Sequence, residues 1–266
     1  MLVKSYKLNV MRQTIFRLCF FGMFIPSILS AQTYKIWKGD TINRVDASGL
    51  KQGLWEYFRK DGSRVFQGVY KDGKRTGTFR YYYEDGRPQG TSEFFEDGDA
   101  CNYIGFYPNG KPQSKGIYRK ELKDSTWLYY SEDQWLVSIE NYVNGLKDGV
   151  WETFYDNGKP VEIVPYSKGK QVGVEQKFFY DGKKSFETTY VDGVKEGPMK
   201  CYWPEGTLQY EGVYHAGLKD STWVFNKPNG AWQKDEYYKK GVFITDSDKY
   251  QEQLKKEEEQ KKEKKQ

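Results

Sequence analysis

Aromatic and glycine residues recur along this chain at a fixed step of 24 residues. One phase is mostly aromatic: Trp55, Phe79, Tyr103, Trp127, Trp151, Glu175, Met199 and Trp223. A second phase is mostly glycine: Gly62, Gly86, Gly110, Gln134, Gly158, Gly182, Gly206 and Gly230. A third is aromatic throughout: Tyr70, Phe94, Tyr118, Tyr142, Tyr166, Tyr190, Tyr214 and Tyr238. Three phases in register over this length establish an internal repeat, which is typical of repeat architectures.

Each repeat has the pattern of a β-hairpin. An Asp or Asn precedes most of the turn glycines, and Asx-Gly between two apolar runs is a strong hairpin signal because both residues tolerate positive φ. Pro108-Asn109-Gly110 fits a type I turn followed by a left-handed glycine, which predicts a three-residue loop. A second glycine-containing bend, such as 145–149, joins successive hairpins. The sequence therefore predicts an all-β fold, an elongated open antiparallel meander of about eight 24-residue hairpin repeats over residues 49–245.

Side-chain parity leaves two arrangements open for this sheet. Trp55 and Phe58 are three residues apart, and successive residues of a strand point to opposite faces. Either a β-bulge turns one of them to the other side, or both faces carry aromatic residues. In the second case one face would be a packed seam and the other a partly exposed aromatic floor.

The repeat unit resembles a known family. Residues 147–159 read Lys-Asp-Gly-Val-Trp-Glu-Thr-Phe-Tyr-Asp-Asn-Gly-Lys, which is similar to the MORN-variant repeat of bacteria. The resemblance covers about residues 49–241 and implies an open β-hairpin array that serves as an antitoxin-like or protein-interaction module. Eukaryotic relatives are linked to membrane or partner binding. Glu175, Met199 and Gln134 depart from the pattern. A looser resemblance connects the aromatic hairpins to choline- and glucan-binding repeats of bacterial surface proteins.

The two ends of the chain differ from the array. Arg12 and Arg17 precede an apolar stretch that ends at Ser30-Ala31, which predicts a signal peptide over residues 1–31, starting at Met1 or at Met11. The apolar stretch is short for a bilayer, so we expect no stable transmembrane segment after cleavage. The predicted location is outside the cytoplasm, in the periplasm or at the cell surface. Residues 32–48 form an N-terminal segment, and residues 246–266 a charged Lys/Glu-rich tail with helical i, i+4 pairs.

Charge and reactive residues exclude several functions. The formal charge of +5 falls close to zero once the four basic residues of the leader are removed, which gives no basic face for nucleic acid. His215 is the one histidine, so neither a Ser-His-Asp arrangement nor a His-rich metal site is expected. Cys101 and Cys201 lie about four repeats apart, roughly 40 Å along a flat sheet, too far for a disulfide. We expect a non-enzymatic protein without cofactor or metal.

The aromatic residues are the remaining candidates for function. They either pack one repeat on the next or form an exposed binding floor. The candidate partner-binding residues are Trp127, Tyr129, Trp151, Tyr155, Trp203 and Trp223. Such a floor would take a protein partner, with the chain acting as a scaffold or an inhibitor, or alternatively an envelope glycan or lipid. Exposed end strands also make pairing between copies an open alternative.

Overall fold

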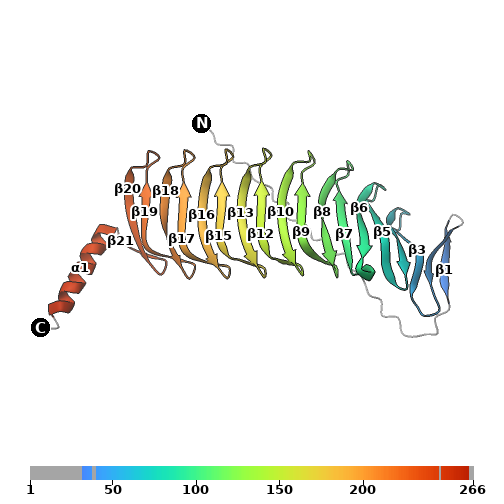
Figure 1. The fold of residues 1–266 in the computed structure, drawn as a ribbon. Helices are drawn as coiled ribbons and strands as arrows, with labels where there is room; N and C mark the ends of the chain where they lie inside the picture. Colours follow the sequence, from blue (N-terminus) through green and yellow to red (C-terminus); the bar gives the residue numbers. More distant parts are fainter. Residues whose placement is uncertain (1–31, 38–39, 246, 264–266) are drawn as a thin grey trace.

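The computed structural model describes residues 32–37, 40–245 and 247–263. Within these residues the chain forms one open antiparallel sheet of 21 strands, followed by one helix. Strands pair with their neighbours in sequence, so the sheet is a long meander whose strands run across the long axis (Figure 1). The predicted all-β, open hairpin array is confirmed.

The strands follow the repeat closely, and two of them are short because a bulge interrupts the strand. Their bounds are β1 Thr33–Trp37, β2 Asp40–Val45, β3 Lys51–Phe58, β4 Arg64–Lys71, β5 Lys74–Tyr82, β6 Pro88–Phe95, β7 Ala100–Phe106, β8 Pro112–Arg119, β9 Leu122–Tyr130, β10 Leu136–Val143, β11 Leu146–Lys147, β12 Gly149–Phe154, β13 Pro160–Ser167, β14 Lys170–Gln171, β15 Gly173–Phe178, β16 Lys184–Val191, β17 Val194–Tyr202, β18 Leu208–His215, β19 Leu218–Asn226, β20 Trp232–Lys239 and β21 Val242–Thr245. The helix α1 spans Ser247–Glu263.

The hairpin loops have the predicted three-residue form. In the loop 108–110, the Gly110 amide donates to the Tyr107 carbonyl at 2.8 Å, and the Tyr107 amide donates to the Lys111 carbonyl at 2.9 Å. Gly110 has φ 82°, the left-handed conformation that the loop requires. These loops all lie along one long edge of the sheet, which we call the loop edge (Figure 1).

The opposite edge, the bend edge, holds the turns that join one repeat to the next. Most are two-residue turns in which both residues have positive φ, such as Asp72-Gly73 with φ 50° and 78°. This is the type I′ geometry that suits twisted hairpins. One joint is irregular: a short 3-10 turn, η1 Glu96–Gly98, connects β6 to β7.

Bulges, two of them in most repeats, determine which residues share a face. In the second strand an extra residue, Val65, separates the pairs Tyr57–Phe66 and Phe58–Arg64. On the first strand the alternation from Trp55 to Phe58 is unbroken, so these two rings point to opposite faces. Both faces of the sheet therefore carry aromatic residues, the second of the two arrangements expected from sequence.

The two ends of the array have different structures. β1 pairs with β2, and β2 pairs with β3, so these two strands extend the sheet at its N-terminal end. At the far end, α1 leaves the sheet beside β20 and β21 (Figure 1). One of its i, i+4 ion pairs, between Glu252 and Lys256, has a distance of 2.8 Å. The predicted signal peptide lies outside the described residues. Within the described part of the chain, no helix is long and apolar enough to cross a membrane.

Candidate functional site

One face of the sheet, the ladder face, carries the Trp55 and Tyr70 phases of every repeat. Their rings meet edge to face along the array, with centroids 5.6 Å apart for Trp55–Tyr70, 5.2 Å for Tyr70–Phe79 and 4.7 Å for Tyr118–Trp127. Such contacts add to the burial that large rings provide. The ladder therefore joins the two strands of a hairpin and also joins one repeat to the next.

At some positions a glycine on the neighbouring strand allows a ladder ring to pack directly against the backbone. Three residues of β9 face the single Gly116 of β8, and a Cβ on Gly116 would lie 2.3 Å from the Trp127 ring. Gly212 stands in the same relation to Trp223, at 2.2 Å. Trp127 and Trp223 are only 1% and 0% exposed. A single-layer sheet thus buries its largest side chains against its own backbone.

A lysine covers many of the ladder rings from the bend edge. Lys147 Nζ lies 3.8 Å from the Trp151 ring centre and 4.5 Å from that of Tyr166, and Lys219 stands similarly over Trp223 and Tyr238. These are cation–π distances. Burial lowers the pKa of Lys147, as it does for Lys51 and Lys123. Where a bend has a lysine at this position, its contacts with the aromatic rings of the ladder explain its presence.

The ladder is interrupted where the sequence departs from the repeat. Glu175 stands in place of the tryptophan and is 5% exposed. Lys177 lies 3.1 Å from Glu175 and 2.9 Å from Glu162, which compensates the buried charge. Burial raises the pKa of Glu162, whereas hydrogen bonds from Glu162 and Lys177 outweigh burial and lower the pKa of Glu175. An ionic cluster thus replaces the missing ring at this repeat.

Hydrogen bonds along both edges connect each repeat to the next. On the loop edge, Tyr155 Oη donates to the Phe178 carbonyl at 2.8 Å, and Trp203 Nε1 donates to the Asn226 carbonyl at 3.2 Å. On the bend edge, Asp148 Oδ2 accepts from the Lys168 amide at 2.9 Å. Equivalent bonds form in several other repeats, such as those from Tyr107 Oη to the Tyr130 carbonyl and from the Ala216 amide to Glu196 Oε2. The sequence places Asp148 in a bend, but it does not reveal that its carboxylate accepts a hydrogen bond from a backbone amide in the next bend along the array.

The six candidate residues predicted from sequence are now placed. Trp127, Tyr129, Trp151 and Trp223 lie together on the ladder face, where Trp127 and Trp223 are fully buried and the other two half-buried. Tyr155 and Trp203 follow the ends of β12 and β17 and bond to the next repeat at the loop edge. For Trp127 and Trp223 the structure corresponds to the packing alternative, because neighbouring side chains and backbone cover their rings.

The opposite face, the row face, carries a different set of rings that the prediction did not single out. One half-buried aromatic residue per repeat stands near the loop edge: Phe58, Tyr82, Phe106, Tyr130, Phe154, Phe178 and Tyr202. Among the described residues, no helix or second sheet lies over them (Figure 1). Their cross-strand partners include Pro112 and Pro160, which lie opposite Phe106 and Phe154. This aromatic row repeats at the same 24-residue step as the ladder, so the signal was present in the sequence.

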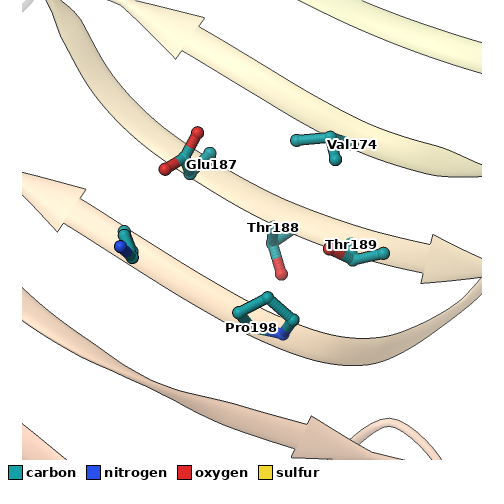
Figure 2. A pocket seen from close by; sticks show the side chains of 6 residues that line it. Val174, Glu187, Thr188, Thr189 and Pro198 are labelled. Carbon is teal, nitrogen blue, oxygen red and sulfur yellow. The ribbon is translucent and has the colours of Figure 1, made fainter.

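The row face also has a shallow depression of about 270 Å³ between β15, β16 and β17. Figure 2 shows Val174 and Pro198 on either side of Thr188 and Thr189, with Glu187 further along the strand. Small-molecule sites are usually concave and enclose roughly 300–1,000 Å³. The depression is smaller and open, so its geometry favours contact with a surface over enclosure of a ligand.

Reactive groups do not gather anywhere in the described part of the chain. His215 Nδ1 lies 2.7 Å from Glu196 Oε1 on the bend edge and is largely exposed. Cys101 on β7 is buried and Cys201 on β17 is half-buried, and neither forms a disulfide. The described residues contain no cluster of three or more His, Cys, Asp or Glu side chains that would hold a metal ion.

Three segments of the sequence are similar to a known repeat. Residues 102–120, 147–168 and 195–216 match the MORN repeat variant. Each matched segment covers the two strands of one hairpin and the loop between them, which is the unit that the structure repeats. MORN repeats are non-catalytic modules that typically bind proteins or membranes. No curated protein matches the chain.

Proposed function

We propose that this chain is a non-enzymatic, exported binding protein that holds a protein partner on its row face. The observation that carries this proposal is the aromatic row, which extends over seven repeats. Lys35 of β1 stands over its first ring, Phe58, and no described helix or second sheet covers the row. Aromatic side chains dominate binding hot spots, and a contiguous apolar surface on a soluble protein often marks an interaction site. The ladder face is a weaker candidate, because its largest rings are buried and its lysines already stack on aromatic rings.

Three repeats form the most apolar part of the row face. Phe106, Tyr130 and Phe154 stand opposite Pro112, Leu136 and Pro160, respectively. Their row-face neighbours are mostly aliphatic: Ile104, Leu128, Ile139 and Ile163. Ile104 is 37% exposed. We place the partner over this segment, from β7 to β13.

Capture of the partner from cell-envelope extract, followed by cross-linking, tests this assignment. Tyr130→Ser should reduce capture at least tenfold, because it removes a ring from the centre of the apolar segment, and Tyr130→Phe should restore it. The matched control is Tyr57→Ser on the ladder face, where the side chain is 60% exposed. Equal loss with Tyr57→Ser, or full capture with Tyr130→Ser, would contradict the proposal. Circular dichroism confirms that each variant is folded.

Export and inhibition are further parts of the proposal. Their support is the predicted signal peptide over residues 1–31 and the resemblance to antitoxin-like repeats, and an exported inhibitor of an exported toxin satisfies both. Intact mass of the protein purified from the envelope fraction should correspond to a chain that begins at Gln32. A full-length mass in the cytoplasmic fraction would contradict export.

An envelope glycan or lipid is the second candidate ligand. Aromatic rings stack on sugars, and apolar rows next to lysines suit anionic lipids. The same capture experiment distinguishes these ligands, since neither polysaccharide nor liposomes yields a cross-linked protein band.

A further inference from the structure

The spacing of the aromatic row is set by the fold. Each repeat adds two strands, and neighbouring strands lie about 4.8 Å apart, so successive rings of the row are spaced at about 9.6 Å. The row runs along the array, perpendicular to the strands (Figure 1). A ligand that lies along it meets one ring per step of this length.

From this spacing we propose that the row face binds a proline-rich segment in the polyproline II conformation, with one helical turn per repeat. This inference rests on the proposed function and names the chemistry of the partner. A polyproline II helix has three residues per turn and a rise of 3.1 Å, which gives a pitch of about 9.3 Å. Every third residue of such a segment therefore faces a ring of the row.

Other extended or helical ligands fit the row less well. A β-strand presents residues on the same side every ~6.7 Å, and an α-helix completes a turn every ~5.4 Å. Neither spacing matches rings that lie ~9.6 Å apart. Over three repeats the polyproline II mismatch accumulates to only about 1 Å. Aromatic surfaces bind proline-rich segments in several domain families, because the ligand is already extended and loses little conformational entropy.

The side chains around the row define its apolar length. From Phe106 to Phe154, the strand-paired partners Pro112, Leu136 and Pro160 are all apolar. One charge approaches this stretch, because Lys115 Nζ lies 5.5 Å from the centre of the Tyr130 ring. At the N-terminal end Arg64 pairs with Glu56 at 3.0 Å and stands over Phe58 and Tyr82. At the C-terminal end Tyr202 donates to Glu187, which also pairs with Lys184. The stretch with apolar partners covers three rings, which corresponds to about nine ligand residues.

A decaproline peptide with acetyl and amide ends is the probe that tests this inference. Titration into the mature chain, followed by isothermal calorimetry, should give saturable binding. Tyr130→Ser should weaken that binding about tenfold, whereas Tyr57→Ser on the ladder face should leave it unchanged. A Gly-Ser peptide of equal length lacks the polyproline II preference and should not bind.

The opposite results overturn the inference. Decaproline that binds no better than the Gly-Ser peptide, or binding that survives Tyr130→Ser, shows that the row does not recognise polyproline II. Cellohexaose that binds in place of decaproline assigns the row to a glycan. Partner capture that depends on Tyr130 while decaproline fails to bind preserves the proposed function and rejects only this ligand chemistry.

Discussion

Gly116 and Trp127 are in direct contact across neighbouring strands, and the absence of a side chain at Gly116 is what allows Trp127 to be 1% exposed. A Cβ at residue 116 would lie 2.3 Å from the indole ring. Gly212 and Trp223 repeat this relation four units later. The pair shows how a sheet without a second layer makes a core.

Gly116→Ala should therefore destabilise the chain by about 1–3 kcal/mol, the range for overpacking a tight contact. Urea unfolding of the mature chain measures the effect. In a Trp127→Leu background the same change should have a much smaller effect, because the smaller side chain leaves room for the added methyl group. An equal loss of stability in both backgrounds would show that the contact is not the reason for glycine at this position.

Ser125 and Ser221 occupy the bulge position that is glycine in most repeats. Their φ angles are 59° and 61°, in the left-handed region that disfavours residues with a Cβ by about 1–2 kcal/mol. Ser125→Gly should raise the free energy of unfolding by about 0.5–1 kcal/mol, since the greater freedom of glycine in the unfolded chain offsets part of the gain. The reverse change at the equivalent Gly173, Gly173→Ser, should lower it by a similar amount. If Ser125→Gly is destabilising, the 2.9 Å contact of the Ser125 hydroxyl with Asp124 outweighs the backbone strain.

Turn carboxylates should make the array sensitive to acid. Hydrogen bonds from backbone amides, Ser63 to Asp61 and Lys183 to Asp181, lower the pKa of both carboxyl groups. Because the folded pKa lies below the unfolded value of about 3.9, the unfolded chain binds more protons as the pH falls. Stability should be constant from neutral pH to about pH 5 and then decrease as the pH falls through the folded pKa values.

Substitution to asparagine provides the control, since Asn109 and Asn157 already accept the equivalent amide bond at 3.0 Å. The Asp61→Asn, Asp181→Asn double variant should keep the stability of the parent at neutral pH and lose less of it between pH 5 and pH 3. Thermal unfolding across this range measures both values. An unchanged acid dependence would assign the effect to other groups.

The fold could be predicted from sequence because each repeat contains its own signals. The Asx-Gly turns, the bend glycines and the regular aromatic phases each indicate the same hairpin, and the structure has loops of the predicted length at these positions. Strand bulges were harder to predict. The extra residue at Val65 depends on the three-residue loop that precedes it, and it determines which side chains of β4 face the ladder.

The candidate site was predicted less completely. The sequence marks tryptophans as important but does not show whether a ring is buried, and in this fold burial depends on the residue across the next strand. Gly68, Gly116 and Gly212 each precede by 11 residues the aromatic ring that packs on them. This spacing connects two different positions of the repeat, so a comparison of equivalent positions alone does not reveal it. The aromatic row was visible at Phe58 and Phe154 but could not be assigned as an open face until both bulges were located.

The central claim is that the ladder face stabilises the array while the row face binds the partner. Site-specific photo-cross-linking tests it most directly, with benzoylphenylalanine placed at Phe106 or Phe154 on the row face and at Tyr57 or Phe225 on the ladder face. The partner should cross-link from the two row positions and not from the two ladder positions. Cross-links from the ladder positions alone would contradict it and would assign partner binding to the ladder face.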